Sequence, residues 1–202
     1  MGTILFASDL DNTLLFSHRH RQPEDRCVER LNGAEQGFFT RETPDLLPQV
    51  VQRVHLLPIT TRSIEQYQRI QWPDGTAPRI ALTANGAVLL RDGQVDRAWY
   101  AASQALVRDH REALAAVLDH LTRQGGATSE GVYVYAAYPD IPAAERVARD
   151  WCGGSALQAV VSGRKVYFFP PGIDKGTALR RAVERFGPER VIAAGDSVID
   201  VP

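Results

Sequence analysis

Apolar and polar positions alternate along the first part of the chain in blocks that predict strands and helices in turn. Residues 3–8 form a continuous apolar run, which is typical of a strand buried on both faces at the centre of a parallel sheet. Residues 43–54 begin with Thr43 as an expected N-cap, and their apolar positions recur three and four apart, which predicts a helix. A strand over 55–60 and a second helix over 64–70 follow. This order of strand, helix, strand and helix indicates a parallel sheet.

Two stretches interrupt the alternation. Residues 16–40 are only weakly amphipathic and contain Asn32-Gly33, which predicts a surface flap built on a hairpin. Residues 87–169 show another pattern, in which one long amphipathic helix over 101–124 precedes a strand, a helix and two further strands. We therefore expect a separate α+β layer in this part of the chain.

The first pattern then resumes. A helix is expected within residues 172–187, and a strand that begins near residue 190 ends in acidic residues. The sequence therefore predicts an α/β fold, with a doubly wound parallel sheet in a core domain made of residues 1–86 and 170–202. Residues 87–169 are expected to form a domain inserted into this core.

Composition narrows the possible partners. The 202 residues are 44% hydrophobic and 23% charged, with a formal net charge of -1, so the chain offers no basic field for nucleic acid or for an acidic membrane surface. Cys27 and Cys152 are too few for a disulfide framework, and no run resembles a signal peptide or a membrane helix. We expect a cytoplasmic protein with no nucleic-acid or membrane partner.

Polar residues with candidate chemistry stand where the predicted strands end. In open α/β sheets the ligand crevice lies at the carboxyl ends of the strands, so these residues are expected to converge. They are Asp9, Asp11, Thr60, Thr61, Arg62, Lys175, Asp196 and Asp200. Carboxylates from two loops suit Mg²⁺, which prefers oxygen ligands and phosphate-bearing partners. Lys175 is the expected cation, because a lysine in the first turn of a helix opposes the helix dipole and needs another use.

Each of these residues also has a simpler interpretation. Asp9 and Asp11 alone would fit a turn with solvated acids, although the apolar runs on both sides place them beside a core, where an unpaired charge is costly. A calcium loop does not fit, because Leu14 and His20 stand where glycine and glutamate are needed. Thr60 alone could cap the following helix. The argument for a common site rests on the order of all these residues at strand ends.

Four segments of the chain resemble the motifs of the haloacid dehalogenase (HAD) superfamily of phosphohydrolases. "DLDNTLL", "PITTRS", "GIDKGTALRRA" and "AAGDSVID" are similar to the first, second, third and fourth motifs and occur in that order. The long insert lies between the second and third motifs and is entered through "TANGAVLLRDG". The chain therefore looks like the branch with a C2-type cap, which includes the Cof-like and sucrose-phosphate-phosphatase-like sugar phosphatases.

The resemblance implies a role for each matching residue. Asp9 would attack phosphorus to give an aspartyl-phosphate, and Asp11 would protonate the leaving oxygen and then activate the hydrolytic water. The implied Mg²⁺ ligands are Asp9, the backbone carbonyl of Asp11, Asp196 and, in support, Asp200. The implied phosphate and substrate contacts are Thr60, Thr61, Arg62, Asn85 and Lys175. The expected activity is hydrolysis of a small phosphorylated metabolite such as a sugar phosphate.

The chain departs from the family pattern in its second and fourth motifs. Thr61 replaces a glycine of the second motif, and Ile199 replaces an asparagine, which removes a hydrogen-bond donor. The sequence stops at Pro202, where relatives continue with a helix, a strand and a helix, so we expect Asp200 to be poorly held and activity to be weakened. Two alternatives follow: a weakly active or inactive phosphate-binding protein, and a phospho-accepting receiver-like domain, against which the long insert argues.

Overall fold

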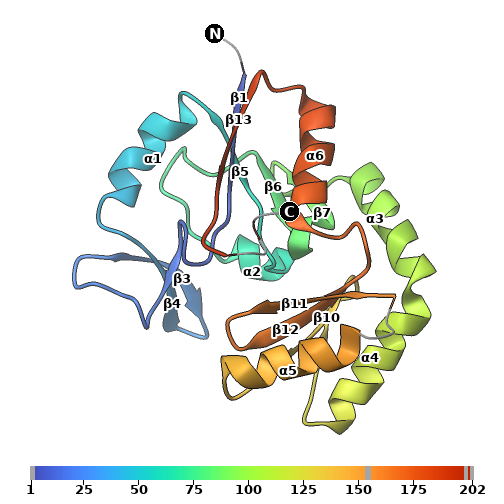
Figure 1. Ribbon diagram of the computed structural model, residues 1–202. Helices are drawn as coiled ribbons and strands as arrows, with labels where there is room; N and C mark the ends of the chain where they lie inside the picture. The colour runs from blue at the N-terminus through green and yellow to red at the C-terminus, as the bar shows by residue number, and fades with distance from the viewer. Residues whose placement is uncertain (1–2, 153–155, 198–199, 201–202) are drawn as a thin grey trace. The chain divides into compact units, whose positions relative to one another are not determined.

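The computed structural model describes residues 3–152, 156–197 and 200 (Figure 1). The chain divides into two compact units. One unit joins the two ends of the chain, Met1–Asp96 and Lys175–Pro202, and the other is Arg97–Asp174. The middle of the chain is thus a unit inserted between the two parts of another.

A parallel sheet forms the centre of the first unit. In spatial order its strands are β13 (Arg190–Ala194), β1 (Ile4–Ser8) and β5 (His55–Pro58). Leu5 of β1 pairs with Val191 on one side and with His55 on the other, and both neighbours run parallel to β1. The apolar run at residues 3–8 is therefore the central strand, and the predicted parallel sheet is confirmed.

A second set of strands continues this sheet. They are β6 (Ile80–Thr83), β7 (Val88–Arg91) and β8 (Gln94–Val95). A parallel bridge between Ile59 and Leu82 joins β6 to the end of β5, and the next two strands are antiparallel. Because β7 and β8 pair with β6, the first unit extends to Asp96, whereas the core domain was expected to end at residue 86. The second part of this unit begins at Lys175, whereas it was expected to begin at residue 170.

Within the described residues, three α-helices belong to the first unit. They are α1 (Thr43–Val51), α2 (Ile64–Gln68) and α6 (Lys175–Phe186). Figure 1 shows α1 and α6 on opposite sides of the strands of this unit. The N-cap of α1 is Glu42, so the expected cap at Thr43 is wrong by one position. The hydroxyl of Thr43 lies instead 2.9 Å from the hydroxyl of Thr40.

The flap after the first strand is a small antiparallel sheet. In spatial order its strands are β2 (Phe16–Ser17), β4 (Ala34–Phe39) and β3 (Arg26–Leu31). The predicted hairpin turn is present, since Asn32 and Gly33 both have positive φ, 51° and 81°, as a tight two-residue turn requires. The register of β3 shifts on both sides of Glu29, and the side chain of Glu29 is buried with only 3% exposure.

The second unit packs helices on an antiparallel sheet. The strands, in spatial order, are β11 (Gln158–Ser162), β12 (Lys165–Phe169), β10 (Val134–Ala137) and β9 (Thr128–Ser129). The helices are α3 (Arg97–Asp109), α4 (Arg111–Arg123) and α5 (Ile141–Cys152). Buried Val117 and Leu121 of α4 join Val134 and Phe168 of the sheet in one core cluster. Among the described residues, no helix is both long enough and apolar enough to span a bilayer.

The helix expected over residues 101–124 is two helices, α3 and α4. They are separated at His110, whose φ of -114° and ψ of 12° leave the helical region. Nδ1 of His110 lies 2.9 Å from the carbonyl oxygen of Leu106, the acceptor that the amide of residue 110 would use in a continuous helix. The amide of His110 bonds to Val107 instead. The side chain thus competes with the backbone and divides the helix.

Candidate active site

Asp9 lies at the carboxyl end of the central strand of the parallel sheet. Its amide donates to the carbonyl oxygen of Ala194 at the end of β13, at 2.9 Å, so the strand pairing fixes the start of the loop. Its side chain is only 7% exposed. Burial raises the pKa of Asp9 from its ordinary 3.8 to about 6, although the neighbouring Lys175 acts in the opposite direction.

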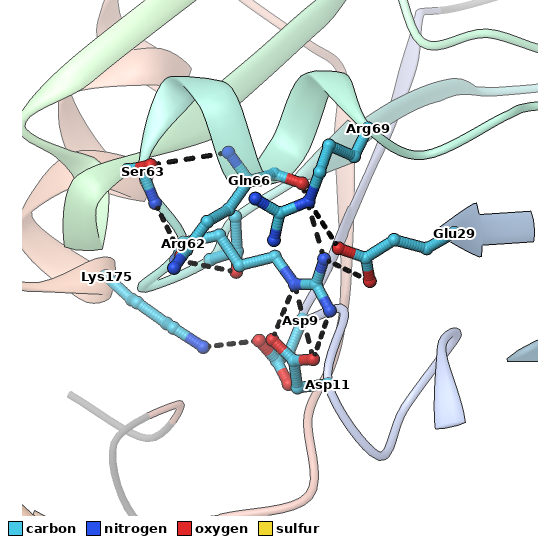
Figure 2. A network of polar contacts seen from close by, with 9 residues as sticks. Asp9, Asp11, Glu29, Arg62, Ser63, Gln66, Arg69 and Lys175 are labelled. Carbon is cyan, nitrogen blue, oxygen red and sulfur yellow. Dashed lines mark hydrogen bonds and ion pairs between the residues drawn. The ribbon is translucent and has the colours of Figure 1, made fainter. Parts of the chain in front are cut away.

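Lys175 provides the positive charge beside Asp9. It is the first residue of α6 and is 5% exposed. Its Nζ donates to Oδ1 of Asp9 at 2.6 Å and to Oδ1 of Asp200 at 2.5 Å (Figure 2 shows the first of these contacts). One ammonium group therefore links residues that are far apart in the sequence, from the loops that follow β1 and β13.

The loop after β13 holds the carboxylate of Asp200. The amides of Asp196 and Ser197 donate to Oδ2 of Asp200 at 3.1 and 3.0 Å, while Lys175 binds the other oxygen. The expectation that Asp200 is poorly held is therefore wrong, because the loop itself supplies the donors. Ile199, where the sequence departs from the family pattern, lies outside the described residues.

Three carboxylates converge at this point in a way that fits a divalent cation. Oxygen atoms of Asp9, Asp196 and Asp200 all lie within 4.8 Å of one another. Lys175 is the cation that contacts two of them among the described residues, which leaves a surplus of negative charge when all three acids are ionised. An all-oxygen donor set with this surplus suits Mg²⁺. The donor set therefore fits the metal that the sequence predicts.

Asp11 is not a member of this carboxylate cluster, and its side chain pairs with an arginine. Its carboxylate accepts from Nη2 of Arg62 at 2.8 Å and from Nε at 3.0 Å, which is a two-pronged ion pair (Figure 2). The side chain of Asp11 is 49% exposed, whereas that of Arg62 is 14% exposed. The turn that follows depends on Asn12, whose φ of 64° is a left-handed conformation that asparagine tolerates.

The same arginine also binds a flap residue that sequence reasoning missed. Nη1 of Arg62 donates to Oε2 of Glu29 at 2.9 Å, and Nε of Arg69 donates to Oε1 of Glu29 at 3.0 Å (Figure 2). Glu29 is thus a buried carboxylate with one arginine on each oxygen. A glutamate inside a strand of mixed character gives no signal of burial, because the register shift that turns it inward is visible only in the structure.

The loop after β5 brings the second group of predicted residues to the site. Thr60 is fully buried, and its hydroxyl accepts from the amide of Arg62 at 3.1 Å. The N-cap of α2 is Ser63, which forms a capping box with Gln66, so Thr60 does not cap that helix. Thr61 lies between Thr60 and Arg62 in this loop.

Asn85 supports this loop through its backbone. Its amide donates to the carbonyl oxygen of Thr60 at 2.9 Å, and the amide of Ala84 donates to that of Arg62 at 2.7 Å. Ala84 and Asn85 have positive φ values of 50° and 57°, a strained pair that the two hydrogen bonds hold in place. The backbone of Asn85 is therefore hydrogen-bonded to the loop that contains Thr60. A contact between Asn85 and substrate stays a prediction.

Comparison with solved structures identifies the fold. The sucrose-phosphatase of Synechocystis sp. PCC6803, determined in complex with sucrose and phosphate, matches with a TM-score of 0.61 and 16% identity, covering 100% of this chain and 78% of that one. A haloacid dehalogenase-like hydrolase from B. subtilis matches with a TM-score of 0.58 and 18% identity, covering 97% of this chain and 84% of that one. Trehalose-6-phosphate phosphatase from Aspergillus fumigatus gives a TM-score of 0.54 and 15% identity, with coverages of 98% and 74%.

These likenesses confirm the α/β, Rossmann-like part of the predicted fold. The chain has the α/β fold of the HAD-superfamily phosphatases that it matches, as the four sequence motifs indicated. No family model matches the chain, and no curated protein matches it in sequence. What this particular chain does has therefore to be argued from its own residues.

Proposed function

We propose that this chain is a magnesium-dependent phosphatase that hydrolyses a small phosphorylated metabolite through a phosphoryl group carried on Asp9. The observation that carries the proposal is the buried carboxylate of Asp9 at the end of the central strand, 2.6 Å from Nζ of Lys175. Two further carboxylates, Asp196 and Asp200, share the same point. A nucleophile, a fixed cation and a set of metal ligands are thus within reach of one phosphoryl group.

In the proposed first step, a carboxylate oxygen of Asp9 forms a bond to phosphorus while the bond from phosphorus to the leaving oxygen breaks. Asp11, two residues further along, enters this step in its protonated form and gives that proton to the leaving oxygen, which leaves it as the ionised carboxylate that pairs with Arg62. In the second step Asp11 takes a proton from water, the water oxygen bonds to phosphorus, and the bond from phosphorus to Asp9 breaks. Inorganic phosphate leaves, and Asp9 returns to its starting state.

Lys175 and Thr60 are proposed to hold the phosphoryl oxygens. Transfer of a phosphoryl group depends mostly on positioning and on stabilising charge that spreads over the oxygens, and an ammonium group and a hydroxyl supply both. Asp9, Asp196, Asp200 and the backbone carbonyl of Asp11 would hold Mg²⁺, which when bound supplies charge neutralisation among the acids and the phosphate. The proposed contacts of Thr61, Arg62 and Asn85 with substrate come from the family resemblance.

The inserted unit is proposed to be the cap that the resemblance implies. Its antiparallel sheet with helices packed against it is the α+β architecture expected for such a cap. Sucrose-phosphatase and trehalose-6-phosphate phosphatase are among the matching structures, and this supports a sugar phosphate as the substrate.

The test is turnover of p-nitrophenyl phosphate in the presence of Mg²⁺. We expect release of phosphate by the wild-type protein and none above background by Asp9→Asn, which keeps the shape of the side chain but not the nucleophile. Asp119→Asn is the matched control, because Asp119 is an exposed acid that pairs with Arg123 on α4. Wild-type turnover that persists in Asp9→Asn would contradict the proposed mechanism.

The same assay separates the alternatives. A folded protein that binds phosphate but releases none from any substrate in a panel of phosphorylated metabolites would be an inactive phosphate-binding member. A protein that takes up one phosphoryl group on Asp9 and keeps it for hours would instead be a phospho-accepting signalling domain. Repeated turnover supports the phosphatase alone.

A further inference from the structure

The proposed steps give no role to Glu29, the buried carboxylate of the flap. We propose that Glu29 is a positioning residue for Asp11: it fixes the guanidinium of Arg62, which in turn holds the carboxylate of Asp11 in place. This inference rests on the proposed function, in which Asp11 transfers protons. It assigns the flap a part in the chemistry, through a chain of ion pairs from β3 to the loop after β1.

The burial of Glu29 indicates that its charge has a purpose. Its side chain is 3% exposed, and a buried carboxylate destabilises the folded state unless it is fully paired. Both of its oxygens are paired, Oε2 with Arg62 and Oε1 with Arg69. An apolar residue in this place would avoid the cost, so the charge itself is what the position supplies.

The flap is built to make room for this side chain. Glu29 pairs across the hairpin with Gly37, and a Cβ atom at position 37 would lie 2.9 Å from Oε2 of Glu29 and 3.1 Å from Cδ1 of Leu15. Any side chain at position 37 would therefore push the carboxylate away. The register shifts on both sides of Glu29 turn its side chain inward beside Val28, which is also buried.

Charge balance directs Arg62 toward Asp11. Glu29 with its two arginines carries one surplus positive charge, and the ionised form of Asp11, which accepts the proton in the proposed second step, supplies the matching negative charge. The guanidinium is planar and rigid, so the pair with Glu29 through Nη1 fixes the plane in which Nε and Nη2 present their hydrogens to Asp11. A shift of Glu29 is thereby transmitted to the carboxylate of Asp11.

Loss of the positioning of Asp11 should affect substrates differently, depending on the basicity of their leaving group. A positioned acid matters most when the departing oxygen is strongly basic, as in an alkyl phosphate, and least when it is a weakly basic phenolate. The kcat/KM of a phosphatase covers the steps up to departure of the leaving group and excludes hydrolysis of the phosphorylated enzyme. Loss of positioning should therefore lower kcat/KM for alkyl phosphates more than for aryl phosphates.

The experiment compares Glu29→Gln with Glu35→Gln. Glu35 is a closely matched control, since it lies in the same flap sheet and also pairs with two arginines, Arg21 and Arg30, but at the surface. We expect kcat/KM of Glu29→Gln for 2-glycerophosphate to fall about 10-fold to 100-fold further than its kcat/KM for p-nitrophenyl phosphate, a part of the usual contribution of a general acid. For Glu35→Gln the ratio of the two constants should equal that of the wild type.

Gly37→Ala is the second variant, because it displaces the carboxylate of Glu29 without removing its charge. It should shift the same ratio in the same direction, and thermal unfolding of each variant verifies that it is folded. A wild-type ratio in folded Glu29→Gln or Gly37→Ala overturns this inference and leaves the phosphatase proposal standing. Wild-type protein without Asp9-dependent turnover overturns both.

Discussion

Nζ of Lys175 lies 2.6 Å from Oδ1 of Asp9, so the first residue of α6 is ion-paired with the residue that follows β1. Both side chains are almost completely buried. The pair thus joins the two parts of the chain that form the first unit, and it does so at the carboxyl end of the parallel sheet, where an α/β fold binds its ligands.

Replacing Lys175 should be costly for stability. Lys175→Gln leaves Asp9 and Asp200 buried without their cation, so we expect the free energy of unfolding at pH 8 without Mg²⁺ to fall by about 3 kcal/mol. Urea denaturation measures this loss. Lys165→Gln is the control, because Lys165 is exposed on β12. An equal loss of free energy of unfolding in both variants would show that the buried ion pairs of Lys175 do not contribute to stability.

The pH dependence of stability should carry the signature of Asp9. Its pKa rises from 3.8 to about 6 on folding, so between these values the folded state binds more protons than the unfolded state. In the absence of metal, the contribution of Asp9 to the free energy of unfolding should therefore be fully present below about pH 4. It should be lost as the pH rises through about 6. Asp9→Asn should remove it. Urea midpoints of both proteins between pH 4 and pH 8 test this, and parallel curves would argue against the shift.

Mg²⁺ should raise the melting temperature of the wild-type protein. A ligand that binds only the folded state stabilises it in proportion to the logarithm of its concentration above Kd. Asp196→Asn removes one member of the carboxylate cluster and should lower the affinity for Mg²⁺ by at least 10-fold. Melting curves over a series of Mg²⁺ concentrations measure this. The same affinity in Asp196→Asn and in the surface variant Asp119→Asn would exclude Asp196 as a ligand.

The capping box of α2 should contribute to stability on its own. Ser63 accepts from the amide of Gln66, whose side chain accepts in return from the amide of Ser63, so Ser63→Ala should destabilise the protein by about 1 kcal/mol. Ser63 directly follows Arg62, so the activity of Ser63→Ala also tests whether the capping box helps to position Arg62. Chemical denaturation measures the free energy of unfolding of both proteins. A Ser63→Ala variant as stable as the wild type would mean that water replaces the hydrogen bonds of the capping box.

The sequence alone predicted the sheet and the residues at its carboxyl end, for a physical reason. A strand buried on both faces must be apolar, so Ile4–Ser8 is recognisable, and the polar residues after it mark where the strand leaves the core. The turn at Asn32-Gly33 was equally readable, because few residues accept positive φ.

Other features depend on contacts that no local pattern encodes. The break at His110 needs a ring nitrogen to find the carbonyl of Leu106, which a helical periodicity does not exclude. The burial of Glu29 depends on a register shift and on the space left by Gly37 across the hairpin. The support of Asp200 by the amides of its own loop is likewise a matter of loop conformation.

The pairing of β1 with β13 has a consequence for biosynthesis. During translation β1 is synthesised early, but its parallel neighbour β13 is synthesised only after the whole Arg97–Asp174 unit. Until then the amide of Asp9 lacks Ala194, and Lys175 and Asp200 are not yet in place. A nascent chain released before residue 175 therefore contains Asp9, the proposed nucleophile, without Lys175 and Asp200 beside it, so we expect incomplete products of translation to be inactive as phosphatases.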